Sequence, residues 1–243
     1  MNTVMPIFKR ELRSYFTTPV AYVFIVIFLF LAGLFTFNIS TLFESNQASL
    51  RAFFEWLPWL YLFLVPAVGM RLWAEERRSG TIELLLTMPT TIWQAVMAKF
   101  LAAWVFLIIA LALTFPMVLT VVYLGDPDMG VIFASYAGAV LMAGALLAIG
   151  LCMSALTRNQ VISFVLAIVI ILIFMLAGFD IVQSFFSSWS VQMAEAVGSL
   201  SFQNHFRHIL LGNIRVADLL FYVSMILGWL YATRLIVEMK KDG

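Results

Sequence analysis

Six long apolar runs constrain this chain more than any other feature of its sequence. A helix needs about 20 apolar residues to cross the hydrocarbon core of a bilayer, where it is stable because it bonds its own backbone groups. Hydrophobic residues make up 63% of the chain and charged residues 11%, whereas a soluble domain carries about 25% charge. The sequence therefore predicts a single all-α integral membrane domain over residues 1–243, with six transmembrane helices at 20–41, 53–70, 100–124, 131–156, 161–179 and 217–237.

The basic residues predict how these helices are oriented. Lys and Arg are enriched in cytoplasmic loops, and an N-terminus in the cytoplasm leaves three of the 14 basic residues outside (Arg51, Arg207 and Arg215) and 11 inside. The first apolar run is longer than the core of a signal peptide, so we expect it to remain in the protein. The pattern predicts a multi-pass protein of the bacterial inner membrane, with both termini and the loop at 71–99 in the cytoplasm.

Residues 1–18 have the pattern of an amphipathic helix. At about 100° per residue, apolar side chains gather on one side, and Lys9, Arg10 and Arg13 gather on the other. This arrangement is typical of a helix that lies among lipid headgroups. Glu11 falls on the apolar side, which predicts either a local ion pair or a neighbouring protein segment at that position.

The segment at 180–216 also has helical character. Its apolar residues recur at roughly helical spacing, so we expect one or two short helices at the outer leaflet before the last span. His205 and His208 are the two histidines of the chain and lie here, three positions apart. Such a pair could bind a metal ion, but no cysteine or further histidine is near it in the sequence. We therefore interpret the pair as part of a polar face and assign no metal site.

Two other residue types have structural explanations. Cys152 is the single cysteine and lies within an apolar run, so we interpret it as a packing residue. Most of the tryptophans, Trp73 among them, lie near predicted span ends or loops. This placement is typical of anchoring at the membrane surface.

Several kinds of chemistry are absent from the sequence. Ionisable residues in the membrane mark ion pathways, yet Glu55, Asp218 and Arg234 all lie near span ends. This disfavours an ion-coupled carrier, which a buried carboxylate network would bring back into consideration. No lysine follows a glycine, so the phosphate-binding Gly-Lys pair is missing. We therefore expect no enzymatic activity, no cofactor and no nucleic-acid partner for this chain.

The loop at 71–99 is the long polar interruption between the apolar runs. It contains Glu75, Glu76, Arg77 and Arg78 and then an apolar stretch that Pro89 closes. Apolar side chains in that stretch need a protein or lipid surface to cover them. The loop therefore favours contact with a soluble partner, and the alternative is a plain solvated loop.

Residues 75–89, followed by Lys99, resemble the signature loop of ABC-2-type transporter permeases. Among these, the chain is most similar to the gliding-motility-type permease subunits, and the resemblance extends over essentially the whole sequence. It implies that two permease subunits, identical or related, form the membrane unit. Two separate ATPase subunits, which would bind the ATP and Mg, are implied beneath them.

The resemblance also implies a site. In such permeases, the loop between the second and third spans acts as a coupling helix seated on the ATPase. Here Glu76 and Glu83 can pair with basic residues of the ATPase, Gly80 allows a sharp turn, and Thr81 is placed to cap the following helix. Carried onto this sequence, the coupling residues are Glu75, Glu76, Arg77, Gly80, Thr81, Glu83 and Leu84.

Two functions remain open, because a fold does not reveal a cargo. The first is a permease subunit that couples ATP hydrolysis to export of an unidentified substrate or to work on the cell envelope. The second is a non-transporting membrane anchor that relays ATPase cycling through residues 180–216. Membrane lipid and an accessory membrane or periplasmic protein are the further partners that these hypotheses imply.

Overall fold

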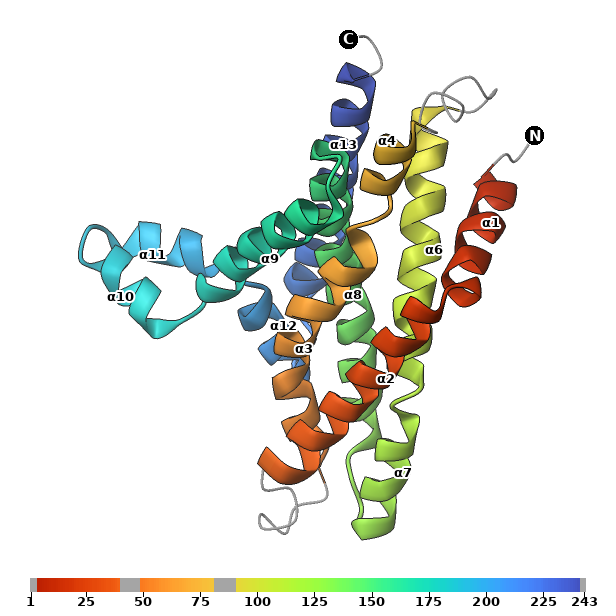
Figure 1. The fold of residues 1–243 in the computed structure, drawn as a ribbon. Helices are drawn as coiled ribbons and strands as arrows, with labels where there is room; N and C mark the ends of the chain where they lie inside the picture. Colours follow the sequence, from red (N-terminus) through yellow and green to blue (C-terminus); the bar gives the residue numbers. More distant parts are fainter. Residues whose placement is uncertain (1–3, 40–48, 81–90, 241–243) are drawn as a thin grey trace.

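The computed structural model describes residues 4–39, 49–80 and 91–240, and these residues form helices without any strand. The long helices lie side by side in an elongated bundle (Figure 1). In chain order they are α1 (Val4–Thr17), α2 (Pro19–Leu34), a π-helix (Phe35–Ile39), α3 (Arg51–Gly69), α4 (Ala74–Ser79), α6 (Ile92–Ala112), α7 (Phe115–Leu124), α8 (Met129–Leu156), α9 (Gln160–Leu176), α10 (Asp180–Ser187), α11 (Val191–Gly198), α12 (Phe202–Leu210) and α13 (Val216–Met239).

Five segments of the described chain are long and apolar enough to cross a membrane, which confirms a multi-pass membrane protein. A sixth is present only if α9 and α10 count as one span, and these two helices meet at a bend of 68°. Five or six candidate spans agree with the prediction of six, and the predicted fifth span at 161–179 corresponds to α9, which the bend follows. The bend includes Gly178, which follows α9. A Cβ at this position would collide with the hydroxyl of Ser201 at the start of α12. The five segments are Pro19–Phe37, Arg51–Ser79, Ile92–Leu124, Met129–Leu156 and Val216–Met239.

Helix α8 is the centre of the bundle. In its most apolar stretch, 83% of the residues are buried inside the protein, more than for any of the other four spans. Helices α3, α6, α9, α12 and α13 all pack against it. Small residues permit this, because helices in a membrane pack best where backbones approach closely. A Cβ added to Gly69 of α3 would lie 3.4 Å from the Gly150 carbonyl carbon. Cys152 is also buried in α8, as its interpretation as a packing residue requires.

The third span differs from the prediction at its start. Helix α6 begins at Ile92, eight residues before the predicted boundary, so Lys99 lies inside the helix rather than at its mouth. Thr91 and Gln94 form a capping box there, each side chain bonding the other's backbone N–H. The span then breaks between α6 and α7, where Pro116 begins a new helix.

The segment before the last span contains three short helices rather than one or two. Helices α10 and α11 project from the bundle (Figure 1), and large apolar side chains such as Phe185 on α10 and Trp189 in the turn between the two helices are exposed. Helix α12 instead packs against α8, with Phe206 and Ile209 buried. Phe202, Phe206 and Ile209 form an apolar face of α12 that is buried in the core, whereas the place of this segment at the outer leaflet stays a prediction.

Candidate functional site

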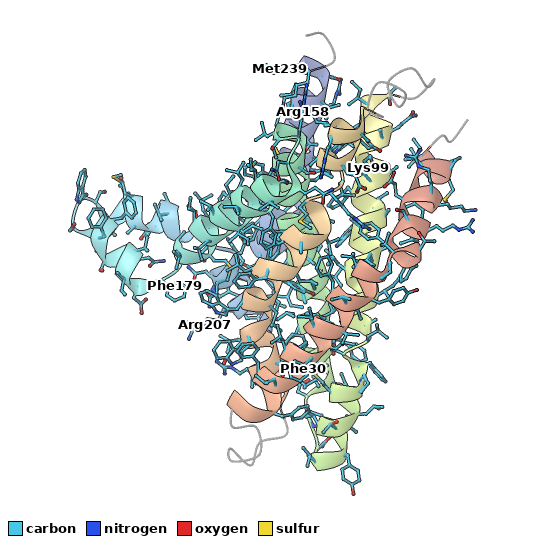
Figure 2. The ribbon with its side chains drawn as sticks, in the orientation of Figure 1. Phe30, Lys99, Arg158, Phe179, Arg207 and Met239 are labelled. Atoms are coloured by element: carbon cyan, nitrogen blue, oxygen red, sulfur yellow. The ribbon has the colours of Figure 1, made fainter. Side chains whose placement is uncertain are left out.

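The polar contacts of the described residues concentrate at one end of the bundle, which we call the charged end and define by Lys99, Arg158 and Lys240. The start of the 71–99 segment lies here, as do α1 and the end of α13. Figure 2 shows Lys99 where α1, α4 and α6 converge, with Arg158 and Met239 at the same end. Arg207 on α12 lies well away from them.

Lys99 is the buried cation of this end. Its side chain is 2% exposed, and its Nζ lies 2.8 Å from Oε1 of Glu76 and 3.2 Å from Oε1 of Glu11. The two carboxylates come from α4 and α1, so one ammonium on α6 joins three helices. Burying a charge is costly unless it is paired, and this pairing explains why Lys99 is tolerated in an apolar helix.

Glu11 has both of the partners that its position on the apolar face of α1 suggested. Arg10 lies 2.9 Å away as a local partner, and Lys99 is the partner from a neighbouring helix. Burial by itself would raise the pKa of Glu11, but the charges of Lys99 and Arg10 outweigh burial and hold this pKa below its usual value. Glu11 is therefore a carboxylate at neutral pH.

Trp73 completes the pocket around the ammonium. Its ring centroid lies 5.3 Å from Lys99 Nζ, within range of a cation–π interaction. The residue is fully buried, so the prediction that Trp73 anchors the chain at a membrane surface is wrong. It belongs to the protein core because the turn that follows α3 folds back toward α6 and α8.

Ser154 of α8 holds that turn in place. Its Oγ accepts hydrogen bonds from the backbone N–H groups of Trp73 and Ala74, both at 3.0 Å. The same hydroxyl donates to the carbonyl of Met70 at 2.8 Å. The turn leaves these backbone groups without helical partners, and one buried hydroxyl satisfies three of them.

Two cations bind the last carbonyls of α8. Arg77 donates to the carbonyl of Ala155 at 2.7 Å, and Lys240 donates to Ala155 and Leu156 at 3.2 and 2.7 Å. A helix C-terminus favours positive charge because its final carbonyls lack helical donors. Burial lowers the pKa of Lys240, and the nearby Arg77 and Arg158 lower it further. This contact ties α4 and the end of α13 to α8.

The predicted coupling residues divide into two sets. Glu76 and Arg77 face the bundle, while Glu75 and Gly80 are exposed. Gly80 ends α4 in the left-handed conformation, with φ of 72°, and the sharp turn predicted from it into the following helix stays a prediction. Glu76 was expected to pair with a partner protein, but its short ion pair is with Lys99 of its own chain. Thr81, Glu83 and Leu84 lie outside the described residues.

Sequence reasoning missed the roles of Lys99, Ser154 and Asp218. The sequence held a signal for Lys99. Glu11 is a carboxylate on the apolar face of an amphipathic helix, and Lys99 adjoins a long apolar run, so the two charges can pair with each other. Ser154 offered no signal, since a serine in an apolar helix usually bonds its own backbone. Asp218 was recognised only as a residue near a span end, yet it lies beside both histidines.

The opposite end of the bundle is hollowed. A cleft of about 590 Å³ lies between the start of α3, the turn that joins α7 to α8, and α12; Arg51, Asp126 and Asp128 are among the residues that line it. A second cleft of about 390 Å³ lies between α3 and α12, with Glu55 and Arg207 in its lining. Both clefts carry charge of both signs.

Comparison with protein families decides the identity of this bundle. Residues 5–231 match the family model described as ABC-2 family transporter protein. The chain belongs to the ABC-2 transporter family. A search of curated proteins found no significant match. ABC-2 membrane subunits are generally non-catalytic and work with ATPase subunits supplied by partners.

Proposed function

We propose that this chain is the permease subunit of an ATP-binding-cassette transporter of the gliding-motility type. Two such subunits, identical or related, would form the membrane unit in the bacterial inner membrane. The charged end and both termini would face the cytoplasm, where separate ATPase subunits hydrolyse ATP. The cycle would export a substrate or do work on the cell envelope.

The observation that carries this proposal is the way α4 is fastened to the bundle. Its inner side bonds α6 through Glu76 and Lys99, and it bonds α8 through Arg77 and Ser154. Through the same groups it is connected to α1 and to the end of α13. Force applied to α4 would therefore reach at least four helices at once, which is what a coupling element must achieve.

The outer side of α4 is exposed and could contact a partner protein. Glu75 and Arg78 are exposed, as is Gly80, which directs the chain into residues 81–90. We propose that these side chains, together with Thr81, Glu83 and Leu84, contact the ATPase. In this arrangement Glu76 and Arg77 act within the permease and transmit the movement to it.

The alternative function, a non-transporting mechanotransmitter, is favoured by α10 and α11. These helices project from the bundle (Figure 1), and Ile181 on α10 and Trp189 in the turn that joins α10 to α11 are 82% and 75% exposed. Exposed apolar patches of this kind mark contact with protein or lipid. A membrane or periplasmic partner held there would receive the ATPase-driven movement directly.

Loop variants test the coupling assignment. Glu83→Lys and Thr81→Ala should release the ATPase or uncouple its turnover, while the permease stays folded in the membrane. Glu55→Lys is a matched control, because Glu55 is an exposed carboxylate whose ion pair to Arg51 belongs to α3 at the opposite end. ATPase co-purification and turnover are the measurements. Unchanged recruitment and turnover in both loop variants would refute the assignment.

A further inference from the structure

His205, His208 and Asp218 converge from α12 and α13, outside the 71–99 segment. Oδ1 of Asp218 lies 2.5 Å from Nδ1 of His205 and 3.2 Å from Nδ1 of His208. One candidate ligand atom from each residue lies within 4.8 Å of the other two. The histidines are on α12, three positions apart, and the carboxylate is in the first turn of α13.

The carboxylate is buried but only partly satisfied. Asp218 is 1% exposed, and its second oxygen, Oδ2, has no hydrogen-bond partner among residues 4–39, 49–80 and 91–240. A buried anionic oxygen without a partner is costly. Its presence indicates that a positive group is needed at this site.

The ring of His205 shows which kind of group fits. Its Nε2 lies 2.9 Å from the carbonyl oxygen of Ser199, which can only accept, so Nε2 carries a proton. In a neutral imidazole, Nδ1 is then a lone pair that faces the carboxylate of Asp218. Two acceptors at that distance repel unless a proton on Nδ1 or a metal ion bound to both atoms joins them.

This hydrogen-bond pattern is the usual support of a metal-binding histidine. Such a ligand almost always donates its other ring N–H to a carbonyl or carboxylate, which fixes the tautomer and the ring orientation. Ser199 supplies that carbonyl here. The ring of His205 is held further by stacking on Phe221, with ring centroids 4.1 Å apart.

We propose that His205, His208 and Asp218 bind a Zn²⁺ ion. Imidazole nitrogens with a carboxylate suit zinc, and three protein ligands leave a fourth tetrahedral position for water. Ligand atoms around a tetrahedral zinc lie roughly 3.3 Å apart at Zn–N distances of about 2.0 Å. The His205–Asp218 contact must therefore open slightly. His208, whose side chain is 34% exposed, leaves the open position accessible to solvent.

The ion would join α12 to the first turn of α13. Asp218 lies about 30 Å along α13 from Lys240, at a rise of about 1.5 Å per residue. The site is therefore distant from the charged end, and its assignment does not depend on the proposed transport function. Without a metal, the same residues would form a hydrogen-bonded cluster in which His205 and His208 donate to Asp218.

Zinc titration of the full chain decides between these two arrangements. The protein is purified in mild detergent with a tag that contains no histidine, stripped with a chelator, and titrated with Zn²⁺ by calorimetry. Bound metal is then counted by elemental analysis after gel filtration. We expect one Zn²⁺ per chain, and a visible absorption spectrum of tetrahedral Co²⁺ when cobalt replaces zinc.

Variants assign the ion to these residues. His208→Ala and Asp218→Asn should each lower zinc affinity by at least tenfold, and His208→Ala is the safer variant because His208 is the most exposed of the three. Arg207→Ala on the same helix and Cys152→Ser, which removes the only thiol, should bind as the wild type does. Absence of stoichiometric zinc in the wild type would overturn the proposal, as would undiminished binding by folded His208→Ala protein.

Discussion

At the scale of single residues, the ammonium of Lys99 has the most consequences for the fold. It is buried on α6 and neutralises carboxylates from α1 and α4. Both carboxylates are largely shielded from water, since the side chains of Glu11 and Glu76 are 15% and 16% exposed. Removing one partner from such a cluster leaves charge that the protein interior cannot solvate.

Lys99→Met should therefore destabilise the protein by about 2–4 kcal/mol, somewhat less than the loss for a fully buried pair. In a thermal unfolding assay in detergent, this corresponds to a decrease in Tm of roughly 4–16 °C. Arg51→Met is the control, because its ion pair with Glu55 is exposed on both sides and should contribute less than about 1 kcal/mol. Equal effects of the two substitutions would contradict the role given to Lys99.

Glu11 makes this cluster sensitive to acid. Its folded-state pKa lies below the ordinary value of 4.5 because Lys99 and Arg10 outweigh burial. The contribution to stability is therefore complete above about pH 4.5 and is lost as the pH falls through the folded-state pKa. The Tm of the wild type should fall more steeply below pH 4.5 than that of Glu11→Gln. Parallel pH profiles would show that Glu11 is not paired in the folded state.

At the scale of elements, the turn between α3 and α4 depends on a hydroxyl from a distant helix. Ser154 bonds three backbone groups of that turn. Gly80 then ends α4 in a conformation that glycine adopts without strain. The exposed face of the proposed coupling element is therefore set by contacts inside the bundle as much as by its own sequence.

Ser154→Ala should destabilise the protein by about 2–3 kcal/mol, since it leaves buried backbone donors without an acceptor. Ser163→Ala provides a matched comparison. Ser163 is equally buried, and its hydroxyl has no hydrogen-bond partner among residues 4–39, 49–80 and 91–240, so its loss should be neutral or slightly stabilising. Thermal unfolding of both variants measures the difference. A Ser154→Ala protein as stable as Ser163→Ala would contradict the account of the turn.

The elements themselves could largely be predicted from the sequence, because long apolar runs and amphipathic periodicity are local signals. α1, α2, α3, α8 and α13 lie close to their predicted positions. The bend after α9 and the burial of α12 could not be predicted, since both depend on which helices approach one another. For the same reason, the sequence identified residues 71–99 as the candidate site but not the partner of Glu76.

At the scale of the whole molecule, the two ends of the bundle differ in their chemistry. The charged end ties α4 to at least four helices through ion pairs and hydrogen bonds. The opposite end has open clefts, and the proposed zinc site lies near the start of α13, far from Lys240. Under the proposed function, this asymmetry would let a member of the ABC-2 family receive movement at the charged end and use it elsewhere.

Affinity purification of the full chain in mild detergent, followed by mass spectrometry, tests the central claim most directly. Purification should be repeated without nucleotide, with ATP and with a non-hydrolysable analogue. We expect an ATP-binding-cassette ATPase to co-purify with the wild type and to be lost from the Glu83→Lys variant. A chain that purifies alone under every nucleotide condition would contradict the assignment of this protein as the permease subunit of such a transporter.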